Sequence, residues 1–208
     1  MNPEEALKKV AEEVSVCTKC ELNHSRKNSV PGEGPFDSDS MFIGEGPGFH
    51  ENEQGRPFVG AAGKFLDDLL ASIGLSRQEV FITNVVKCRP PSNRDPQADE
   101  LAACSAYLER QIQAINPKVI VTLGRFSMAR YFPNAKISKV HGQAMNVKGR
   151  LIVPMYHPAA ALHQPSLRST IEADFGLLPD LISKSTQVPE LVEPAIEKDE
   201  DPKQLSMF

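Results

Sequence analysis

Four short, almost continuously apolar runs alternate along the chain with longer segments whose apolar residues recur at helical spacing. Continuously apolar strands are typical of parallel sheets buried on both faces, with helices covering those faces. The pattern therefore predicts an α/β fold of three layers, α/β/α, around a central four-stranded parallel sheet. The predicted strands are residues 40–43, 80–86, 118–123 and 151–155. The predicted helices are residues 3–14, 61–73, 97–115, 125–132 and 168–183, with Phe65, Leu66, Leu69 and Leu70 on one face of the second.

The end of the chain has a different composition. The segment 185–208 is rich in proline, holds six acidic and two basic residues, and has few residues that could build a core. Segments of this kind cannot bury enough apolar surface to fold. We therefore expect one folded domain, residues 1–184, followed by a disordered acidic tail that ends in the apolar pentapeptide QLSMF.

The net charge of −4 lies entirely in this predicted tail, so the expected folded domain is neutral. A neutral domain can still bind nucleic acid through a local basic groove. No run of about 18 apolar residues is present, and we expect no membrane-spanning helix. The first residues, MNPEEALKKVAEEV, do not resemble a signal peptide. A cytoplasmic location is expected.

Acidic, amide and imidazole side chains occur where the predicted strands end. Residues 44–60, GEGPGFHENEQGRPFVG, follow the first strand and begin with Gly44 and Glu45. Asn84 lies near the end of the second strand, and His157 follows the fourth. The carboxyl ends of parallel strands meet at one edge of the sheet, where open α/β folds bind ligands. Each residue alone is more often a turn or surface residue, but their convergence predicts a functional site.

The four cysteines form a Cys-x2-Cys pair and, much later, a Cys-x15-Cys pair. In a cytoplasmic protein they are not expected to form disulfides. Four thiolates suit zinc or an iron–sulfur cluster, and zinc ribbons usually use two close Cys-x2-Cys pairs. One close pair with two distant cysteines therefore favours a cluster over zinc. Four unrelated buried cysteines are the alternative. The residues are Cys17, Cys20, Cys88 and Cys104.

Several motifs together resemble those of the family 4 uracil-DNA glycosylases, over roughly residues 14–183. The first glycine-rich motif of that family is commonly GEAPG, and Gly46 replaces the alanine here. Glu45 separates the chain from the family 5 enzymes, which have a nonpolar residue at that position. The segment RPPSNRDPQADELAA lacks the basic, histidine-containing insert of a related group that bonds covalently to uracil. The matching motifs are CTKC at 17–20, GEGPG at 44–48, GRPFVGAAGKFLD at 55–67, TNVVKCRPP at 83–91, Cys104, and YHPAAAL at 156–162.

The resemblance implies an α/β/α fold and hydrolytic excision of uracil from DNA, which leaves an abasic site and initiates base-excision repair. It also implies a 4Fe–4S cluster on the four cysteines. Uracil extruded from the DNA stack would lie against Phe58, and the Asn84 amide would pair with O4 and N3–H of the base. Cytosine presents the opposite pattern of donor and acceptor, so a fixed amide would reject it.

The remaining chemistry is also implied by the resemblance. His157 would donate a hydrogen bond to the negative charge that develops on uracil O2, helped by main-chain N–H groups near Gly46. Glu45 and Glu51 both match acidic positions of the family motif, and either could orient water or stabilise the sugar cation. Glu51 could instead exclude the methyl group of thymine. No lysine is placed for a Schiff base, so a monofunctional enzyme is expected.

The resemblance also suggests DNA contacts, because the family loop that contains HQPSLR approaches the DNA strand. Arg168 is the expected phosphate contact, with Lys87, Arg89 and Arg94 on the same side. Glu53 is expected to be a surface charge. The other histidines are expected at the surface or in turns; they are His24, His50, His141 and His163.

The terminal QLSMF resembles the pentapeptide that binds the bacterial DNA polymerase sliding clamp. A flexible tail would present its apolar side chains to a pocket of the clamp, and Gln204 would fix the register. We therefore predict a monomeric, nucleoid-associated bacterial enzyme tethered to the clamp. The alternatives are a non-catalytic iron–sulfur DNA-binding partner of the clamp and a glycosylase that accepts other deaminated bases. The clamp-binding residues would be Gln204, Leu205, Met207 and Phe208.

Overall fold

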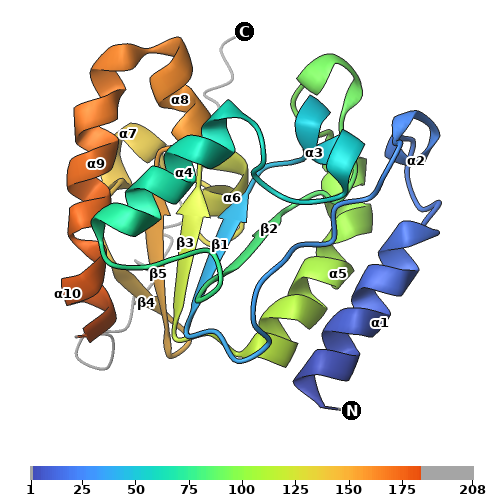
Figure 1. Ribbon diagram of the computed structural model, residues 1–208, viewed down its shortest axis with the longest axis horizontal. Helices are drawn as coiled ribbons and strands as arrows, with labels where there is room; N and C mark the ends of the chain where they lie inside the picture. Colours follow the sequence, from blue (N-terminus) through green and yellow to red (C-terminus); the bar gives the residue numbers. More distant parts are fainter. Residues whose placement is uncertain (1, 184–208) are drawn as a thin grey trace, which may run out of the picture.

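The computed structural model describes residues 2–183 (Figure 1). The boundary predicted at residue 184, the acidic tail and the QLSMF segment lie outside the described residues. In the described part, no helix combines the length and the apolar character needed to cross a membrane.

The centre of the fold is a five-stranded sheet with the order β2-β1-β3-β5-β4. The pairs β1–β2, β1–β3 and β3–β5 are parallel, which confirms the four predicted parallel strands. Their carboxyl ends lie at the top of the molecule in Figure 1. The strands are β1 (Ser40–Gly44), β2 (Phe81–Asn84), β3 (Val119–Leu123), β4 (Met145–Val147) and β5 (Arg150–Met155).

The predicted number of strands is wrong by one, because β4 pairs antiparallel with β5 at the edge of the sheet. Its residues are only half-buried, so the strand leaves no continuous apolar run in the sequence. Lys148 and Gly149 form the two-residue turn between the strands with φ of 53° and 76°. Positive φ at both positions is typical of tight hairpins, but lysine rarely signals such a turn.

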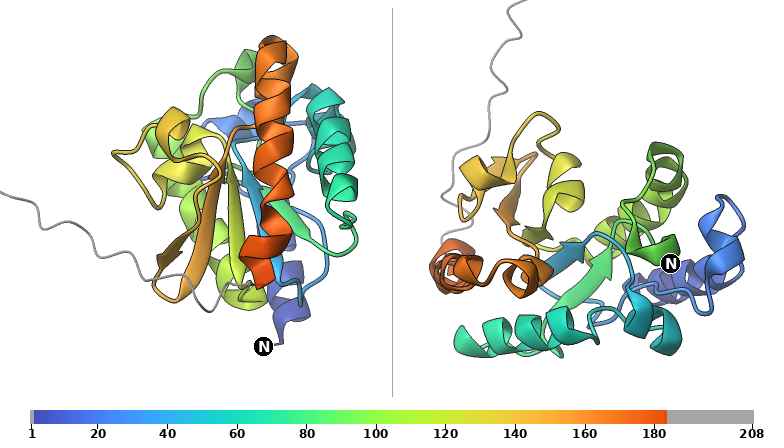
Figure 2. Two further views of the ribbon diagram at one scale, coloured as in Figure 1. Left: turned by 90° about the vertical axis from the view of Figure 1, so that its left-hand side faces the viewer. Right: turned by 90° about the horizontal axis from the view of Figure 1, so that it is seen from above.

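Helices cover both faces of the sheet, as the pattern predicts (Figure 2). Alternation along β1 directs Phe42 to one face and Met41 and Ile43 to the other. The first face carries α4 (Ala61–Ser72), whose four predicted apolar residues are all buried, and also α8 (Pro158–His163), α9 (Arg168–Gly176) and α10 (Leu178–Ser183). The second face carries α5 (Ala98–Ile115) and α6 (Arg125–Ala129), with α1 (Pro3–Ser15) packed against α5. The short elements are α2 (Leu22–Ser25), α3 (Phe49–Gln54), α7 (Ile137–Val140) and the 3₁₀ turns η1 (Pro91–Asn93) and η2 (Pro165–Leu167).

The helix predicted at 168–183 is in fact two helices, α9 and α10. The break lies at Leu177, two residues before Pro179. Proline has no N–H to continue the hydrogen bonding of α9, but it is tolerated in the first turn of a new helix. The apolar pattern runs through both helices because both pack on the same core.

Candidate active site

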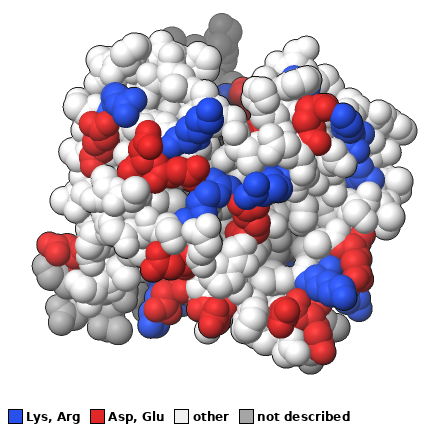
Figure 3. Space-filling model, in the orientation of Figure 1, with Lys and Arg blue, Asp and Glu red and all other residues white. Residues whose placement is uncertain are grey.

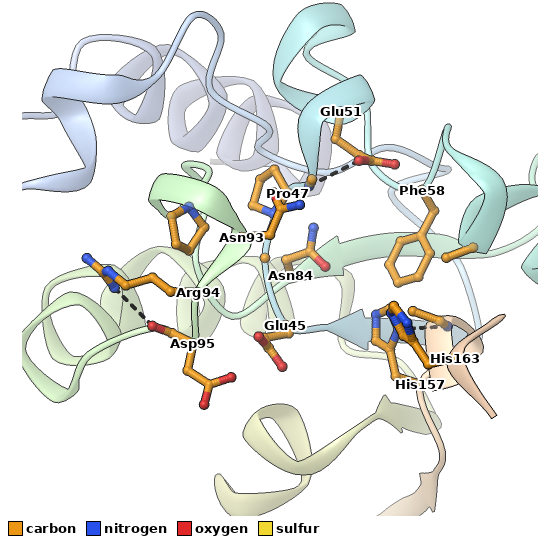
Figure 4. Close-up of a pocket in the computed structure, with 15 residues that line it drawn as sticks. Glu45, Pro47, Glu51, Phe58, Asn84, Asn93, Arg94, Asp95, His157 and His163 are labelled. Atoms are coloured by element: carbon orange, nitrogen blue, oxygen red, sulfur yellow. Dashed lines mark hydrogen bonds between the residues drawn. The ribbon is translucent and has the colours of Figure 1, made fainter. Parts of the chain in front are cut away.

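A cavity of about 490 Å³ opens at the carboxyl ends of the parallel strands. In Figure 4, Phe58 and His157 border it on one side and Arg94 and Asp95 on the other, with Asn84 and Glu45 between them. The structure therefore brings together all six residues predicted for base binding and catalysis. They are Glu45, Gly46, Glu51, Phe58, Asn84 and His157.

The backbone around Phe58 is held in an uncommon conformation, with φ of 52°. Its carbonyl accepts a hydrogen bond of 2.9 Å from Arg77 Nη1, and Gly63 packs so closely that a Cβ there would lie 1.9 Å from the same oxygen. The ring lies beside His157, with centroids 5.4 Å apart and planes inclined by 26°. Gly63 and Arg77 thus fix an aromatic wall of the cavity.

Asn84 is 1% exposed, and its Oδ1 atom has no hydrogen-bond partner within residues 2–183. A Cβ atom at Gly44 would lie 2.4 Å from this oxygen, so only glycine leaves the amide its position. A buried acceptor without a partner costs about 1–3 kcal/mol. The cavity is therefore short of one donor at Asn84.

His157 is the N-cap residue of α8, and its Nδ1 atom accepts a hydrogen bond of 3.1 Å from the N–H of Ala159. This bond leaves the proton of a neutral ring on Nε2. Burial lowers the pKa of His157 to about 4, although the Glu51 carboxylate acts in the opposite direction. The ring is therefore neutral at pH 7 and can donate only from Nε2.

The two acidic residues have different surroundings, which the sequence did not reveal. Glu51 accepts three main-chain hydrogen bonds, from Gly48 at 3.0 Å, Val59 at 2.8 Å and Gly60 at 2.9 Å. It therefore ties the first glycine-rich segment to the loop that carries Phe58. Three of the roughly four lone-pair sites of its carboxylate are therefore used by the protein itself.

The Glu45 carboxylate faces the cavity and makes no hydrogen bond within the part of the chain that the structure describes. Burial raises its pKa above the ordinary value of 4.5, and Asp95 adds to this effect while Arg125 opposes it. A half-buried carboxylate with free oxygens can stabilise a cation or orient water.

The loop after β2 supplies cavity residues that were not predicted as site residues. Asn93 lines the cavity with φ of 54°, and Asp95 forms an ion pair with Arg125 at the start of α6. His163, expected only as a surface or turn residue, also lines the cavity. The proline, asparagine and aspartate in RPPSNRDP were a signal for a loop, but its return over the cavity depends on tertiary contacts.

One of the predicted DNA contacts is wrong. Lys87 is 1% exposed, and its amine is enclosed by hydrogen-bond acceptors, so it cannot reach a phosphate. Arg94 pairs with the buried Glu100 at 2.6 Å. Arg89 lies 5.3 Å from the ring centroid of Phe49.

Arg168 is exposed, but it lies outside the cavity lining, over the ring of Phe65 and 2.9 Å from Glu172. Glu53 is paired with Lys27, as expected of a surface charge. Figure 3 shows Lys and Arg interspersed with Asp and Glu on the face it presents, without a continuous basic stripe.

The four cysteines line one small cavity, separate from the first. Cys17 and Cys20 lie between α1 and α2, whereas Cys88 follows β2 and Cys104 belongs to α5. Donors already approach the sulfurs: the N–H of Lys87 lies 3.3 Å from Cys104 Sγ, and Arg26 Nη1 lies 3.5 Å from Cys88 Sγ. Within residues 2–183, no three side chains converge on the position of a single metal ion.

Comparison with known proteins agrees with this geometry. The model of the uracil DNA glycosylase superfamily matches residues 31–175. A type-4 uracil-DNA glycosylase of Sulfurisphaera tokodaii is 51% identical over 187 residues, covering 85% of each chain. A type-4 enzyme of Thermotoga maritima is 43% identical over 87% of this chain and 97% of its own. A type-5 enzyme of Pyrobaculum aerophilum is 31% identical over 69% of this chain and 70% of its own. The chain therefore belongs to the uracil-DNA glycosylase superfamily, and within it to the type-4 group.

Proposed function

We propose that the chain is a monofunctional uracil-DNA glycosylase, which hydrolyses the N-glycosidic bond of deoxyuridine in DNA and leaves an abasic site for base-excision repair. The observation that carries this proposal is that Asn84 and His157 line the same cavity. The Oδ1 atom of Asn84 is an acceptor without a partner, and the neutral ring of His157 can donate from Nε2. A glycosylase must extrude its base into such a pocket before it can act on it.

Asn84 selects the base in this proposal. Its free Oδ1 accepts the N3–H of uracil, and its Nδ2 donates to O4. Phe58 provides the aromatic surface on which the extruded ring lies. Cytosine would place an acceptor against Oδ1 and a donor against Nδ2, and both pairs of buried groups would remain unsatisfied.

His157 and Glu45 act on the bond that breaks. As the bond lengthens, positive charge grows on the sugar and negative charge on uracil O2. The Nε2–H group of His157 stabilises that oxygen without transferring its proton, because the ring is neutral and its other nitrogen is occupied. Glu45 stabilises the sugar cation and orients the attacking water. Glu51 is a positioning residue that holds the Phe58 loop. No lysine lines the cavity within the described residues.

The experiment that tests the function is a panel of oligonucleotides that contain uracil, thymine, hypoxanthine or xanthine, single-stranded and double-stranded. Alkali-labile abasic product only from uracil is expected. Product from several deaminated bases would favour the broader glycosylase. Tight DNA binding with no base release would favour the non-catalytic DNA-binding partner and reject the enzyme.

Glu45→Gln and Glu51→Ala should separate the two carboxylates. Glu45→Gln is expected to lower kcat about 100-fold or more, because it removes the charge beside the sugar cation. Ionising Glu45 costs the folded state stability above pH 4.5, since its folded pKa is raised, so the variant should be as stable as wild type or more stable. Glu51→Ala should lose about 2–3 kcal/mol of unfolding free energy with its three hydrogen bonds. Single-turnover rates and thermal unfolding at pH 7 measure both effects.

The pH dependence of the rate is a control for the two carboxylate variants. If Glu45 acts as a carboxylate, the wild-type rate falls as the pH is lowered through its raised pKa, and Glu45→Gln loses this acid limb. An unchanged acid limb in Glu45→Gln, or a stable and inactive Glu51→Ala, would reverse the assignment.

The four cysteines are proposed to hold a 4Fe–4S cluster. They line one cavity, and one close Cys-x2-Cys pair with two distant cysteines favours a cluster over zinc. When bound, the cluster would link the α1–α2 segment to the end of β2 and to α5. Burial raises the pKa of the Cys104 thiol to about 11, so a bound metal would supply the charge that keeps this sulfur a thiolate.

Anaerobically purified protein is expected to be brown, with broad absorption near ~400 nm that Cys104→Ser diminishes. Iron and acid-labile sulfide should be present in equal amounts, about four of each per chain. Colourless protein containing one zinc ion would contradict the cluster.

One DNA contact and one protein partner are also proposed. Arg168 is exposed near α8 and is proposed to contact a DNA phosphate. The terminal QLSMF is proposed to tether the enzyme, as a monomer near the nucleoid, to a bacterial sliding clamp. Deletion of residues 204–208 should abolish clamp binding in a pull-down with the purified clamp and leave turnover of short oligonucleotides unchanged. Retained binding would exclude this tether.

A further inference from the structure

The buried Lys87 lines the cysteine cavity, and its amine bonds to the main chain of the pocket residue Asn84. Its Nζ atom donates to Thr83 Oγ1 at 2.6 Å, to Gln111 Oε1 at 2.6 Å and to the main-chain oxygen of Asn84 at 2.9 Å. Its own N–H lies 3.3 Å from Cys104 Sγ. The side chain is 1% exposed and touches no part of the proposed reaction.

The Thr83 and Gln111 acceptors have fixed orientations, because the donor group of each side chain is engaged elsewhere. The Thr83 hydroxyl donates to the Pro31 carbonyl at 2.9 Å, and Gln111 Nε2 donates to the same oxygen at 2.7 Å. Both therefore present lone pairs to Lys87. The Lys87 amine thus has three acceptors within hydrogen-bond distance, all of them supplied by the protein.

A buried lysine is costly, and an apolar side chain of similar size would often be at least as stabilising. Lys87 therefore calls for an explanation other than stability. Its bond to the Asn84 carbonyl fixes the main chain where β2 ends. The next two N–H groups, of Val85 and Val86, are held by the carbonyls of Gly44 at 3.0 Å and Glu45 at 3.1 Å. The main chain at the end of β2 is thus held both by the Lys87 amine and by the carbonyls of Gly44 and Glu45.

We infer that Lys87 is a positioning residue for uracil recognition: it holds the Asn84 main chain in place, so that the Asn84 amide meets the base in one orientation. This inference rests on the proposed function, in which Asn84 pairs with uracil. Lys87 would also transmit the placement of the cysteine segment to the pocket, because its main chain contacts Cys104.

The test is a double-mutant cycle of wild type, Lys87→Met, Asn84→Ala and the double variant. We measure kcat/KM on a uracil oligonucleotide and the Kd for an oligonucleotide with 2′-fluoro-2′-deoxyuridine, which resists hydrolysis. Removing one partner of a buried hydrogen bond typically costs about 10–100-fold. Lys87→Met should therefore weaken both quantities by about this factor in the wild-type background, and by less than about twofold when Asn84 is already alanine.

A merely structural role predicts the same factor in both backgrounds, and that result would overturn the inference. Absorption near ~400 nm is recorded for every variant, and its loss in Lys87→Met would assign the lysine to the cysteine site instead. The control is Lys118→Met, which removes an exposed lysine that pairs with Asp39. It should change neither quantity.

A second variant covers the outcome in which Lys87→Met does not fold. Lys87→Met combined with Gln111→Met replaces both polar partners by apolar groups and avoids an unsatisfied buried acceptor at Gln111. This pair is expected to fold and still to bind the fluorinated oligonucleotide about 10–100-fold more weakly than wild type. Wild-type affinity in this pair would reject the inference. Wild-type protein that releases no uracil would instead reject the proposed function.

Discussion

Replacement of His157 by alanine is expected to lower kcat by about 10²–10³-fold, which corresponds to about 3–4 kcal/mol of transition-state stabilisation. The loss should fall on the chemical step, because the Nε2–H group faces an oxygen whose charge grows only as the bond breaks. Binding of the fluorinated oligonucleotide should change much less. Single-turnover kinetics and equilibrium binding measure the two effects separately.

His157→Asn is the matched control for folding. His157 is the N-cap of α8 and accepts a hydrogen bond from the N–H of Ala159, and asparagine is among the best N-cap residues. The variant should unfold at nearly the wild-type temperature and still lose most of the rate. A rate within threefold of wild type in both variants would remove His157 from the mechanism.

The stability of the folded state provides a second measure of the neutral ring. The folded pKa of His157 is about 4 and lies below the ordinary value of 6.5, so the unfolded chain binds more protons between these values. Stability should therefore fall as the pH drops from about 6.5 towards 4. His157→Asn should lose this part of the pH dependence. Above about pH 5 the His157 ring should remain neutral, so its protonation should not affect the rate.

The site could be predicted from the sequence because its residues follow strands. In a parallel sheet the carboxyl ends lie together, so Glu45, Asn84 and His157 had to converge once the strands were recognised. The apolar runs were continuous, and their assignment needed no tertiary information. The edge strand β4 had no such run, and it forms only because β5 offers it a partner.

The roles within the site could not be predicted in the same way. Glu45 and Glu51 are six positions apart in one glycine-rich segment, and only the fold shows which carboxylate is occupied. The partners of Glu51 at Val59 and Gly60 are main-chain N–H groups, and such groups leave no pattern in residue types. Lys87 was misassigned for a related reason: a lysine beside arginines resembles a phosphate contact until its acceptors are seen.

Asn84→Ala is expected to lower kcat/KM for uracil by about 10²–10⁴-fold and to reduce the preference for uracil over cytosine. The truncation leaves N3–H and O4 of the base buried without partners, and each such group costs about 1–3 kcal/mol. It also removes the amide groups that mismatch cytosine. The ratio of kcat/KM for uracil to kcat/KM for cytosine should therefore fall by a larger factor than the affinity for DNA. Competition assays with uracil and cytosine oligonucleotides, under single-turnover conditions, measure both.

Asn93→Ala is the matched control for Asn84→Ala. Asn93 lines the same cavity and has the same side chain, but it is exposed, and its Oδ1 already accepts a hydrogen bond of 2.8 Å from Arg89. Its loss should change kcat/KM only a few-fold, since no buried group of the base depends on it. Equal losses in the two variants would mean that the amide acts by shaping the cavity. A loss confined to Asn84→Ala would show that recognition depends on the Asn84 amide, whose buried Oδ1 has no donor within residues 2–183.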